Sequence, residues 1–219
     1  MREQTRGLSS NALKLIALLT MFLDHIGAVL IDSGWMNQVL RMVGRVSFPI
    51  FAFLLVEGFL HTRDVKRYGL RLLAFGFLSE IPFDLALFHT PFEMSHQNVF
   101  FTLFLGLLAL EGYRRYEYDA SLWKRAAVLV VCGFAATILR TDYEAFGVIF
   151  IVLLYMTRQS PRMQTIMGSL ALVWELPAVF AFIPIRMYNG TRGTLPLKYI
   201  FYICYPLHLF LLWGIWRLL

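Results

Sequence analysis

The sequence predicts an all-α membrane protein, a polytopic bundle of about eight transmembrane helices. Apolar residues make up 58% of the 219 residues and charged residues only 16%, whereas soluble domains average roughly half apolar and a quarter charged. The apolar residues gather in eight runs, the longest of which reach the roughly twenty residues that cross a bilayer as a helix. We therefore expect a single integral-membrane domain over residues 1–219, embedded in a lipid bilayer.

The eight apolar runs can be placed in order along the chain. The first run follows a polar, basic start; it is too long for a signal peptide, and no small-residue cleavage site follows it. A charged stretch at 141–144 separates two runs that would otherwise read as one helix. The expected helices cover 12–31, 39–60, 67–88, 97–112, 126–140, 143–157, 164–184 and 199–217.

Lysine and arginine are distributed unevenly between the connections. Cytoplasmic loops of membrane proteins are enriched in these residues, so the richer set marks the cytoplasm. That placement puts both termini in the cytoplasm, requires an even number of spans, and explains the net charge of +6 without nucleic acid as a partner. The richer set is Arg2, Arg6, Arg63, Lys66, Arg67, Arg114, Arg115, Lys124, Arg125, Arg158, Arg162 and Arg217. The poorer set is Arg140, Arg186, Arg192 and Lys198.

Asp24 and His25 lie deep in the first apolar run. Ionisable groups at membrane depth are costly, so they face the protein interior or a water-filled cavity and commonly have a function. His25 is a candidate general base, because imidazole exchanges a proton near neutral pH, and Asp24 is a candidate for orienting its ring. The alternative is a buried neutral histidine that only bonds a neighbouring helix.

Polar residues of the other helices are expected at a similar depth, given a helical rise of ~1.5 Å per residue. Arg41 and Arg45 either neutralise nearby carboxylates or form an anion site for phosphate, pantetheine or an oxyanion, since guanidinium offers a fork of donors. Glu80 and Asp84 are the expected carboxylate partners of these arginines. Asn98 opens the fourth helix in the same layer.

The last two apolar runs add three further candidates. Glu175 is expected to pack between helices or share a proton. Tyr205 and His208 flank a proline kink in the last run, and His208 is a second histidine at the depth of His25. His61, His89 and His96 fall at helix ends or in loops, where we expect them to be solvated.

Several other classes of site find no support in the sequence. No HExxH motif or other metal-ligand spacing is present, so no metal is expected. The chain also has neither a GxSxG motif nor a Walker motif, which gives no support to a hydrolase triad or an ATPase. Cys132 and Cys204 lie inside apolar runs and form no CxxC pair.

Several short blocks of the sequence resemble the TraX family. The most specific are MFLDHIG at 21–27 and GRVSFPIFAF at 44–53, and the resemblance covers residues 12–210. The other blocks are KLIA at 14–17, EG at 57–58, SEIP at 79–82, NVFFTL at 98–103 and YPLH at 205–208. TraX of conjugative plasmids is known as an inner-membrane enzyme that N-acetylates pilin. The family is similar to larger transmembrane acyltransferases, in which a histidine of the first helix is catalytic, and His25 matches it.

The resemblance implies a membrane acyltransferase of the bacterial cytoplasmic (inner) membrane. It would move an acetyl or other acyl group from acetyl-CoA or another acyl-CoA to an amine or hydroxyl of an envelope or pilin-like acceptor. His25 would be the base and Asp24 its orienting group. The expected donor-binding or oxyanion residues are Arg45, Arg41, Asn98 and Tyr205, supported by Glu80, Asp84, Glu175 and His208. The alternatives are a small proton-coupled transporter and a non-catalytic protein of envelope or conjugation assembly.

Overall fold

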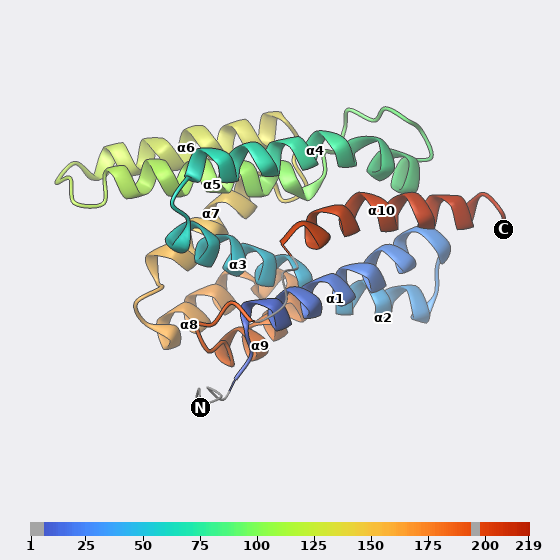
Figure 1. Ribbon diagram of the computed structural model, residues 1–219, viewed down its shortest axis with the longest axis horizontal. Coiled ribbons are helices and arrows are strands. Elements are labelled where there is room, and N and C mark those ends of the chain that lie inside the picture. The colour runs from blue at the N-terminus through green and yellow to red at the C-terminus, as the bar shows by residue number, and fades with distance from the viewer. Residues whose placement is uncertain (1–6, 194–197) are drawn as a thin grey trace. The chain divides into compact units, whose positions relative to one another are not determined.

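The computed structural model describes residues 7–193 and 198–219, and the elements in this part of the chain are helices (Figure 1). Two isolated β-bridges, Leu8–Tyr188 and Gln97–Thr141, join segments outside the helices. The helices are α1 (Ser10–Leu30), α2 (Trp35–Gly44), α3 (Ser47–His61), α4 (Val65–Phe88), α5 (Val99–Arg115) and α6 (Leu122–Ile138). They continue with α7 (Glu144–Met156), α8 (Pro161–Ala171), the 3₁₀ segment η1 (Val173–Ala181), α9 (Phe182–Arg186) and α10 (Lys198–Trp216).

Each of the eight apolar runs is helical, which confirms the all-α prediction. The predicted break at 141–144 is also confirmed, since α6 ends at Ile138 and α7 begins at Glu144. Two runs differ from a single straight helix. The run 39–60 divides into α2 and α3 close to Pro49, and the run 164–184 divides into α8, η1 and α9 around Pro177. A proline has no backbone N–H to continue the ladder of hydrogen bonds, so it favours such breaks.

Within the residues that the structure describes, two stretches are long and apolar enough to cross a membrane. They are α1 and the continuous stretch Trp35–His61, which joins α2 to α3, and both have a mean hydropathy of 1.8. Glu144–Met156 and Phe201–Trp216 are shorter apolar helices. Both stretches fit a helical membrane protein, and the count of eight crossings stays a prediction.

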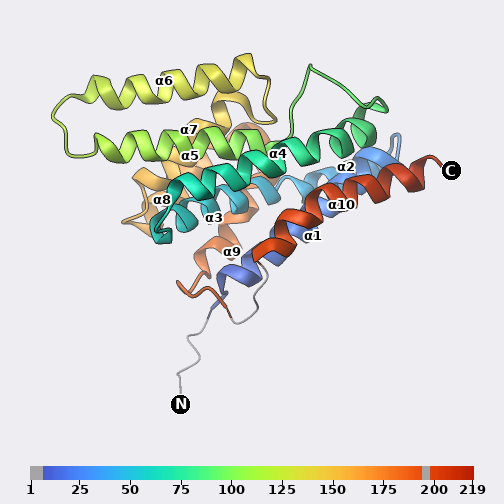
Figure 2. The same cartoon turned by 45° about the horizontal axis from the view of Figure 1, so that its top comes forward.

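The chain divides into two compact units. Unit 1 combines Met1–Leu54 with Pro161–Leu219, and unit 2 is the continuous segment Leu55–Ser160. In unit 1, α1 packs against both α2 and α10, while α8, η1 and α9 pack against one another (Figure 2). In unit 2, α5 packs against α4, α6 and α7, and α6 also packs against α7. Unit 1 is thus built from the two ends of the chain.

A close approach of α1 to α2 depends on two glycines. A Cβ atom placed on Gly44 would lie 2.2 Å from the Cβ of Asp24, and one on Gly27 would lie 3.1 Å from the Cβ of Leu40. The side-chain amide of Asn37 also donates to the carbonyl of Gly27 at 2.7 Å. Because these positions carry no side chain, the backbone of α2 can approach the carboxylate of Asp24 directly.

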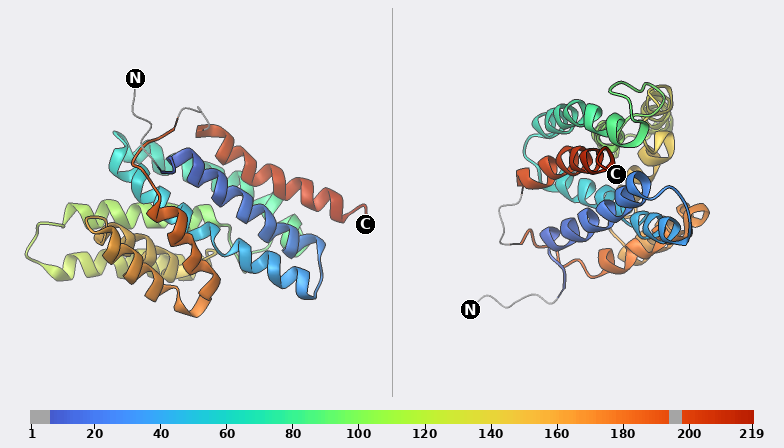
Figure 3. Two further views of the ribbon diagram at one scale, coloured as in Figure 1. Left: turned by 90° about the horizontal axis from the view of Figure 1, so that it is seen from below. Right: turned by 90° about the vertical axis from the view of Figure 1, so that its right-hand side faces the viewer.

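Helices α1 and α10 run in the same direction, side by side (Figure 3). Near their starts, the Lys14 ammonium lies 5.3 Å from the centre of the Phe201 ring. Further along both helices, His25 meets His208. Parallel helices that both cross a membrane end on the same face, so this arrangement does not support a cytoplasmic location for both termini.

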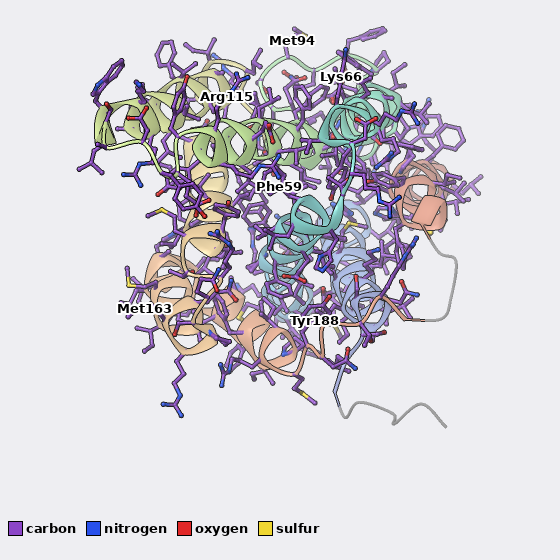
Figure 4. The ribbon with its side chains drawn as sticks, turned by 60° about the vertical axis from the view of Figure 1, so that its left-hand side comes forward. Phe59, Lys66, Met94, Arg115, Met163 and Tyr188 are labelled. Atoms are coloured by element: carbon purple, nitrogen blue, oxygen red, sulfur yellow. The ribbon has the colours of Figure 1, made fainter. Side chains whose placement is uncertain are left out.

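The buried Tyr155 joins several helices at one end of unit 2. The hydroxyl of Tyr155 donates to Glu117 at 2.9 Å, and the Arg158 guanidinium pairs with the same carboxylate at 2.8 Å. Burial raises the pKa of Glu117, but the hydrogen bonds from Arg158 and Tyr155 outweigh it, so the pKa is lowered overall. Phe59, labelled in Figure 4, packs edge-on against the Tyr155 ring at 5.8 Å between centroids. These contacts join the ends of α3, α5 and α7.

Candidate functional site: a buried histidine pair between two parallel helices

The centre of the candidate site is a pair of histidines in unit 1. His25 of α1 and His208 of α10 are each only 8% exposed. The Nδ1 atom of His25 lies 2.6 Å from the Nε2 atom of His208, and the ring centroids are 4.9 Å apart. The structure therefore brings together the two histidines that the sequence placed at one depth.

The hydrogen bonds of His208 determine which ring nitrogens carry protons. Its Nδ1 lies 2.8 Å from the carbonyl oxygen of Cys204, one helical turn earlier. A carbonyl can only accept, so this nitrogen must donate, and the Nε2 of a neutral His208 is then an acceptor. The Nδ1–H of His25 donates a hydrogen bond to this Nε2 atom. A neutral His25 consequently has a lone pair on Nε2, which makes no hydrogen bond within the described residues.

Aromatic side chains hold the two imidazoles in place. Phe22, one turn before His25 on α1, stacks on His208 with 4.4 Å between ring centroids. Tyr205 presents its edge to both rings, at 6.0 Å from His25 and 5.7 Å from His208. Tyr205 is 4% exposed. Rings packed on several sides have few alternative rotamers, so the pair is pre-oriented.

Asp24 points to a different partner from the one expected. Its carboxylate accepts a hydrogen bond from Arg41 of α2 at 2.6 Å, in an ion pair that is largely shielded on the Asp24 side. Consecutive residues of a helix point about 100° apart, since 3.6 residues make one turn. Asp24 therefore faces α2 while His25 faces α10. His208, and not Asp24, is the hydrogen-bond partner of the His25 Nδ1 atom.

Arg45 lies at the break between α2 and α3 and pairs with Glu175. Its Nε is 3.0 Å from the carboxylate, and the side chain of Glu175 is 13% exposed. The prediction that Arg45 pairs with a carboxylate is confirmed; the carboxylate identified is Glu175, whereas Glu80 and Asp84 are the partners expected from the sequence. Glu175 has non-helical backbone angles (φ −132°, ψ 62°) inside η1. The ion pair thus joins two helix breaks.

Asn98, Glu80 and Asp84 belong to unit 2. Asn98 caps α5, accepting from the Phe100 N–H at 3.1 Å, and its amide donates to the Gly76 carbonyl at 2.9 Å and to Glu80. Asp84 accepts from the backbone N–H of Glu93 at 2.9 Å. Asn98 therefore has a structural role at a helix start, which accounts for its amide without an oxyanion. The carboxylates take these partners in place of the arginines expected for them.

His96, expected to be solvated, is half-buried and paired. Its Nε2 lies 3.0 Å from Asp142, which belongs to the loop between α6 and α7. The hydrogen bond with Asp142 raises the pKa of His96, against the opposing effect of burial. The neighbouring backbone is tied as well, since the Gln97 N–H donates to the Arg140 carbonyl at 2.8 Å. This pair fastens the 89–98 loop to the start of α7.

Sequence reasoning missed the Cys204 carbonyl and the Phe22 ring. Both could have been found from helical spacing, because Cys204 and His208 are four residues apart, and Phe22 and His25 are three apart. The pairing across the helices could not, because it depends on how α1 and α10 pack. The described residues contain no cluster of three or more metal-ligating side chains.

The fold and the site define a helical membrane protein with a buried histidine pair between its first and last helices. The family model described as "TraX protein" matches residues 9–216. The chain therefore belongs to the TraX family. It is also 33% identical, over 234 aligned residues, to "Probable fimbrial assembly protein FimC, serogroup H1" of Dichelobacter nodosus, and the alignment covers 93% of this chain and 94% of that protein. No solved structure matches the chain.

Proposed function

We propose that the protein is a multi-pass membrane acyltransferase of the bacterial inner membrane with His25 as its general base. It moves an acetyl or other acyl group from acyl-CoA to an amine or hydroxyl of an envelope or pilin-like acceptor. The observation that carries this proposal is the chain of hydrogen bonds from the Cys204 carbonyl through His208 to His25. That chain leaves an unprotonated Nε2, with an available lone pair, on a buried and pre-oriented imidazole.

The reaction follows from the proton positions in the histidine pair. Nε2 of His25 removes a proton from the acceptor amine or hydroxyl as its nitrogen or oxygen attacks the thioester carbonyl carbon. The tetrahedral intermediate then collapses, the carbon–sulfur bond breaks, and the departing thiolate takes the proton back from His25. Throughout, Nδ1–H of His25 continues to donate to His208. No proton leaves the site, and the base is regenerated.

Charge on the carbonyl oxygen must be stabilised during the attack. Tyr205 is the candidate donor, because its ring borders both histidines. Arg41 is already paired with Asp24, but a guanidinium has five N–H donors. The Arg41 side chain is also 34% exposed. We assign Arg41 and Arg45 to the anionic or amide parts of the acyl-CoA donor and do not assign them to the oxyanion.

The relative supports the class of acceptor. Its name places that protein in fimbrial assembly, which fits an acceptor that is itself a pilus or fimbrial subunit. The same name also favours a second candidate, an assembly protein without catalysis. The two candidates differ in one respect that can be measured, which is the consumption of acyl-CoA.

The test is a transfer assay with purified protein, labelled acetyl-CoA and a panel of amine and hydroxyl acceptors. Loss of a general base reduces rates by ~10²–10⁴-fold, so His25→Ala should lose about that much transfer while remaining folded. His61→Ala is the matched control, since His61 is an exposed histidine of α3. Transfer should also fall at acid pH, where the imidazole is protonated.

Two results would count against the proposal. A folded His25→Ala protein that transfers at the wild-type rate would remove His25 as the base. Pilus or fimbrial assembly that needs the protein, with no consumption of acetyl-CoA by wild type or variant, would favour the non-catalytic candidate.

A further inference from the structure

The segment that precedes α10 turns back on itself. Gly168 of α8 leaves room for the ring of Phe182 of α9, because a Cβ at Gly168 would lie 2.1 Å from the ring Cζ. Between these residues, η1 contains the non-helical Glu175 and Pro177. Helix α8 has 11 residues and so measures about 16 Å, roughly half of the ~30 Å hydrocarbon core. The run 161–186 is thus a hairpin of two short arms.

The far end of this hairpin returns to the start of α1. The N–H of Leu8 donates to the Met187 carbonyl at 2.7 Å, and the N–H of Ser10 donates to the Thr191 carbonyl at 2.8 Å. Leu8 and Tyr188 also form one of the isolated bridges (Tyr188 is labelled in Figure 4). A segment that had crossed the membrane after α8 would end at the opposite end of α1. The contacts show that it ends beside the start of α1.

The direction of α10 agrees with this return. Helix α10 starts beside α1 and runs parallel to it, as the Lys14–Phe201 and His25–His208 contacts show. It therefore crosses in the same sense as α1. With a cytoplasmic N-terminus, the end of α10 lies outside.

We propose that residues 161–186 form a re-entrant hairpin that enters and leaves the membrane on the cytoplasmic side, and that its tip lines the passage taken by the acyl-CoA thioester. Seven helical crossings then remain: α1, α2 with α3, α4, α5, α6, α7 and α10. The count is odd, so the termini lie on opposite faces. The passage for the thioester rests on the proposed function, whereas the hairpin itself does not.

The distribution of basic residues favours the hairpin. Returning to the cytoplasm moves Arg186, Arg192 and Lys198 to the basic side, and only Arg217 changes to the other side. The asymmetry of lysine and arginine becomes sharper than in an eight-span arrangement.

The tip of the hairpin is suited to line a polar passage. Non-helical backbone at membrane depth is tolerated only inside protein or beside water, and broken helices commonly form the binding sites of membrane proteins. At this tip, Glu175 meets Arg45, which itself lies at the break between α2 and α3. A thioester arm that enters from the cytoplasm would pass these polar groups before it reaches the histidine pair.

The topology is tested by thiol labelling in a background where Cys132 and Cys204 are replaced by alanine. Met187→Cys reports the face on which the run 161–186 ends, and Leu218→Cys reports the face on which α10 ends. Both positions are exposed. Ser33→Cys and Tyr118→Cys are the references for the outer and cytoplasmic faces. With a membrane-impermeant reagent, Ser33→Cys and Leu218→Cys should react in intact cells, whereas Met187→Cys and Tyr118→Cys should react only after permeabilisation.

Any other pattern contradicts the hairpin or its cytoplasmic entry. Labelling of Met187→Cys in intact cells with protection of Leu218→Cys would show a full crossing by 161–186. Thr191→Cys gives the same information should Met187→Cys fail to accumulate.

The passage is tested separately at its tip. Glu175→Cys should react with a water-soluble thiol reagent from the cytoplasmic side, and coenzyme A should slow that reaction several-fold. Arg45→Cys is the reciprocal variant, should Glu175→Cys fail to accumulate. Labelling that coenzyme A does not slow would overturn the passage and leave the hairpin standing. Neither measurement depends on transfer activity, so failure of the enzymatic proposal would be seen independently in the transfer assay.

Discussion

His25 and His208 are 183 positions apart in the chain and are joined by a hydrogen bond of 2.6 Å. The bond is directional, because the Cys204 carbonyl fixes His208 as a donor at Nδ1 and hence as an acceptor at Nε2. The first histidine therefore depends on the second for its tautomer. Removing either ring should affect the site in a different way.

His208 is expected to act as a positioning residue. His208→Ala removes the acceptor for Nδ1–H of His25, so the ring can rotate or change tautomer, and transfer should fall by ~10-fold or more. His208→Gln retains an acceptor oxygen close to the former Nε2 and should restore part of the rate. The pH profile of transfer should shift in His208→Ala and stay closer to wild type in His208→Gln. Equal loss in both variants, with an unchanged pH profile, would reduce His208 to a packing residue.

The Asp24–Arg41 pair should affect stability more than chemistry. Losing one partner leaves the other charge partly buried, at a cost between the ~1 kcal/mol typical of exposed pairs and the ~3–5 kcal/mol of buried ones. Asp24→Asn and Arg41→Gln should each lower the unfolding temperature in detergent, and the double variant should lose less than the sum of the two. Additive losses would show that the two side chains are not coupled.

Gly44 tests the close approach of α1 and α2. Gly44→Ala puts a methyl group 2.2 Å from the Asp24 Cβ, and overpacking of this kind costs ~1–3 kcal/mol. Gly214→Ala is the matched control, since a Cβ there meets no atom within 4 Å among the described residues. It should be neutral or stabilise α10 by up to ~1 kcal/mol. Comparable melting temperatures for the two variants would contradict the tight contact.

The His96–Asp142 pair predicts a pH-dependent contribution to stability. Because the pKa of His96 is raised in the folded protein, its contribution is complete below the ordinary histidine pKa of ~6.5 and is lost as the pH rises through the raised value. His96→Gln and Asp142→Asn should both flatten this part of the stability profile, measured by unfolding in detergent between mildly acid and mildly alkaline pH. A wild-type slope retained in both variants would exclude the pair as its source.

The helices themselves could be predicted from sequence because the apolar runs and the charged break at 141–144 are local signals. The choice of His25 as a candidate site residue, and the expectation that His208 lies at the same depth, followed from the cost of polar groups in a membrane. The partners could not be predicted in this way. Whether Asp24 faces His25 or Arg41 depends on helix rotation, and whether Arg45 meets Glu80 or Glu175 depends on which helices are neighbours.

The re-entrant hairpin proposed for residues 161–186 illustrates a related limit of the sequence signal. An apolar run of about twenty residues predicts a crossing only if it stays straight, and the run 164–184 contains a turn at Glu175 and Pro177. Hydropathy measures how apolar a segment is and carries no information about whether the chain reverses its direction within that segment. The contacts of residues 187–192 with the start of α1 supply that information.

The division of unit 1 between the two ends of the chain has a consequence for biosynthesis. In the chain, His25 of α1 is separated from His208 of α10 by the whole of unit 2. During translation the imidazole of His25 is therefore made long before its partner, and its tautomer is not fixed until α10 has been synthesised and packed against α1. A product truncated before α10 would keep α1 and lack the hydrogen-bonded histidine pair.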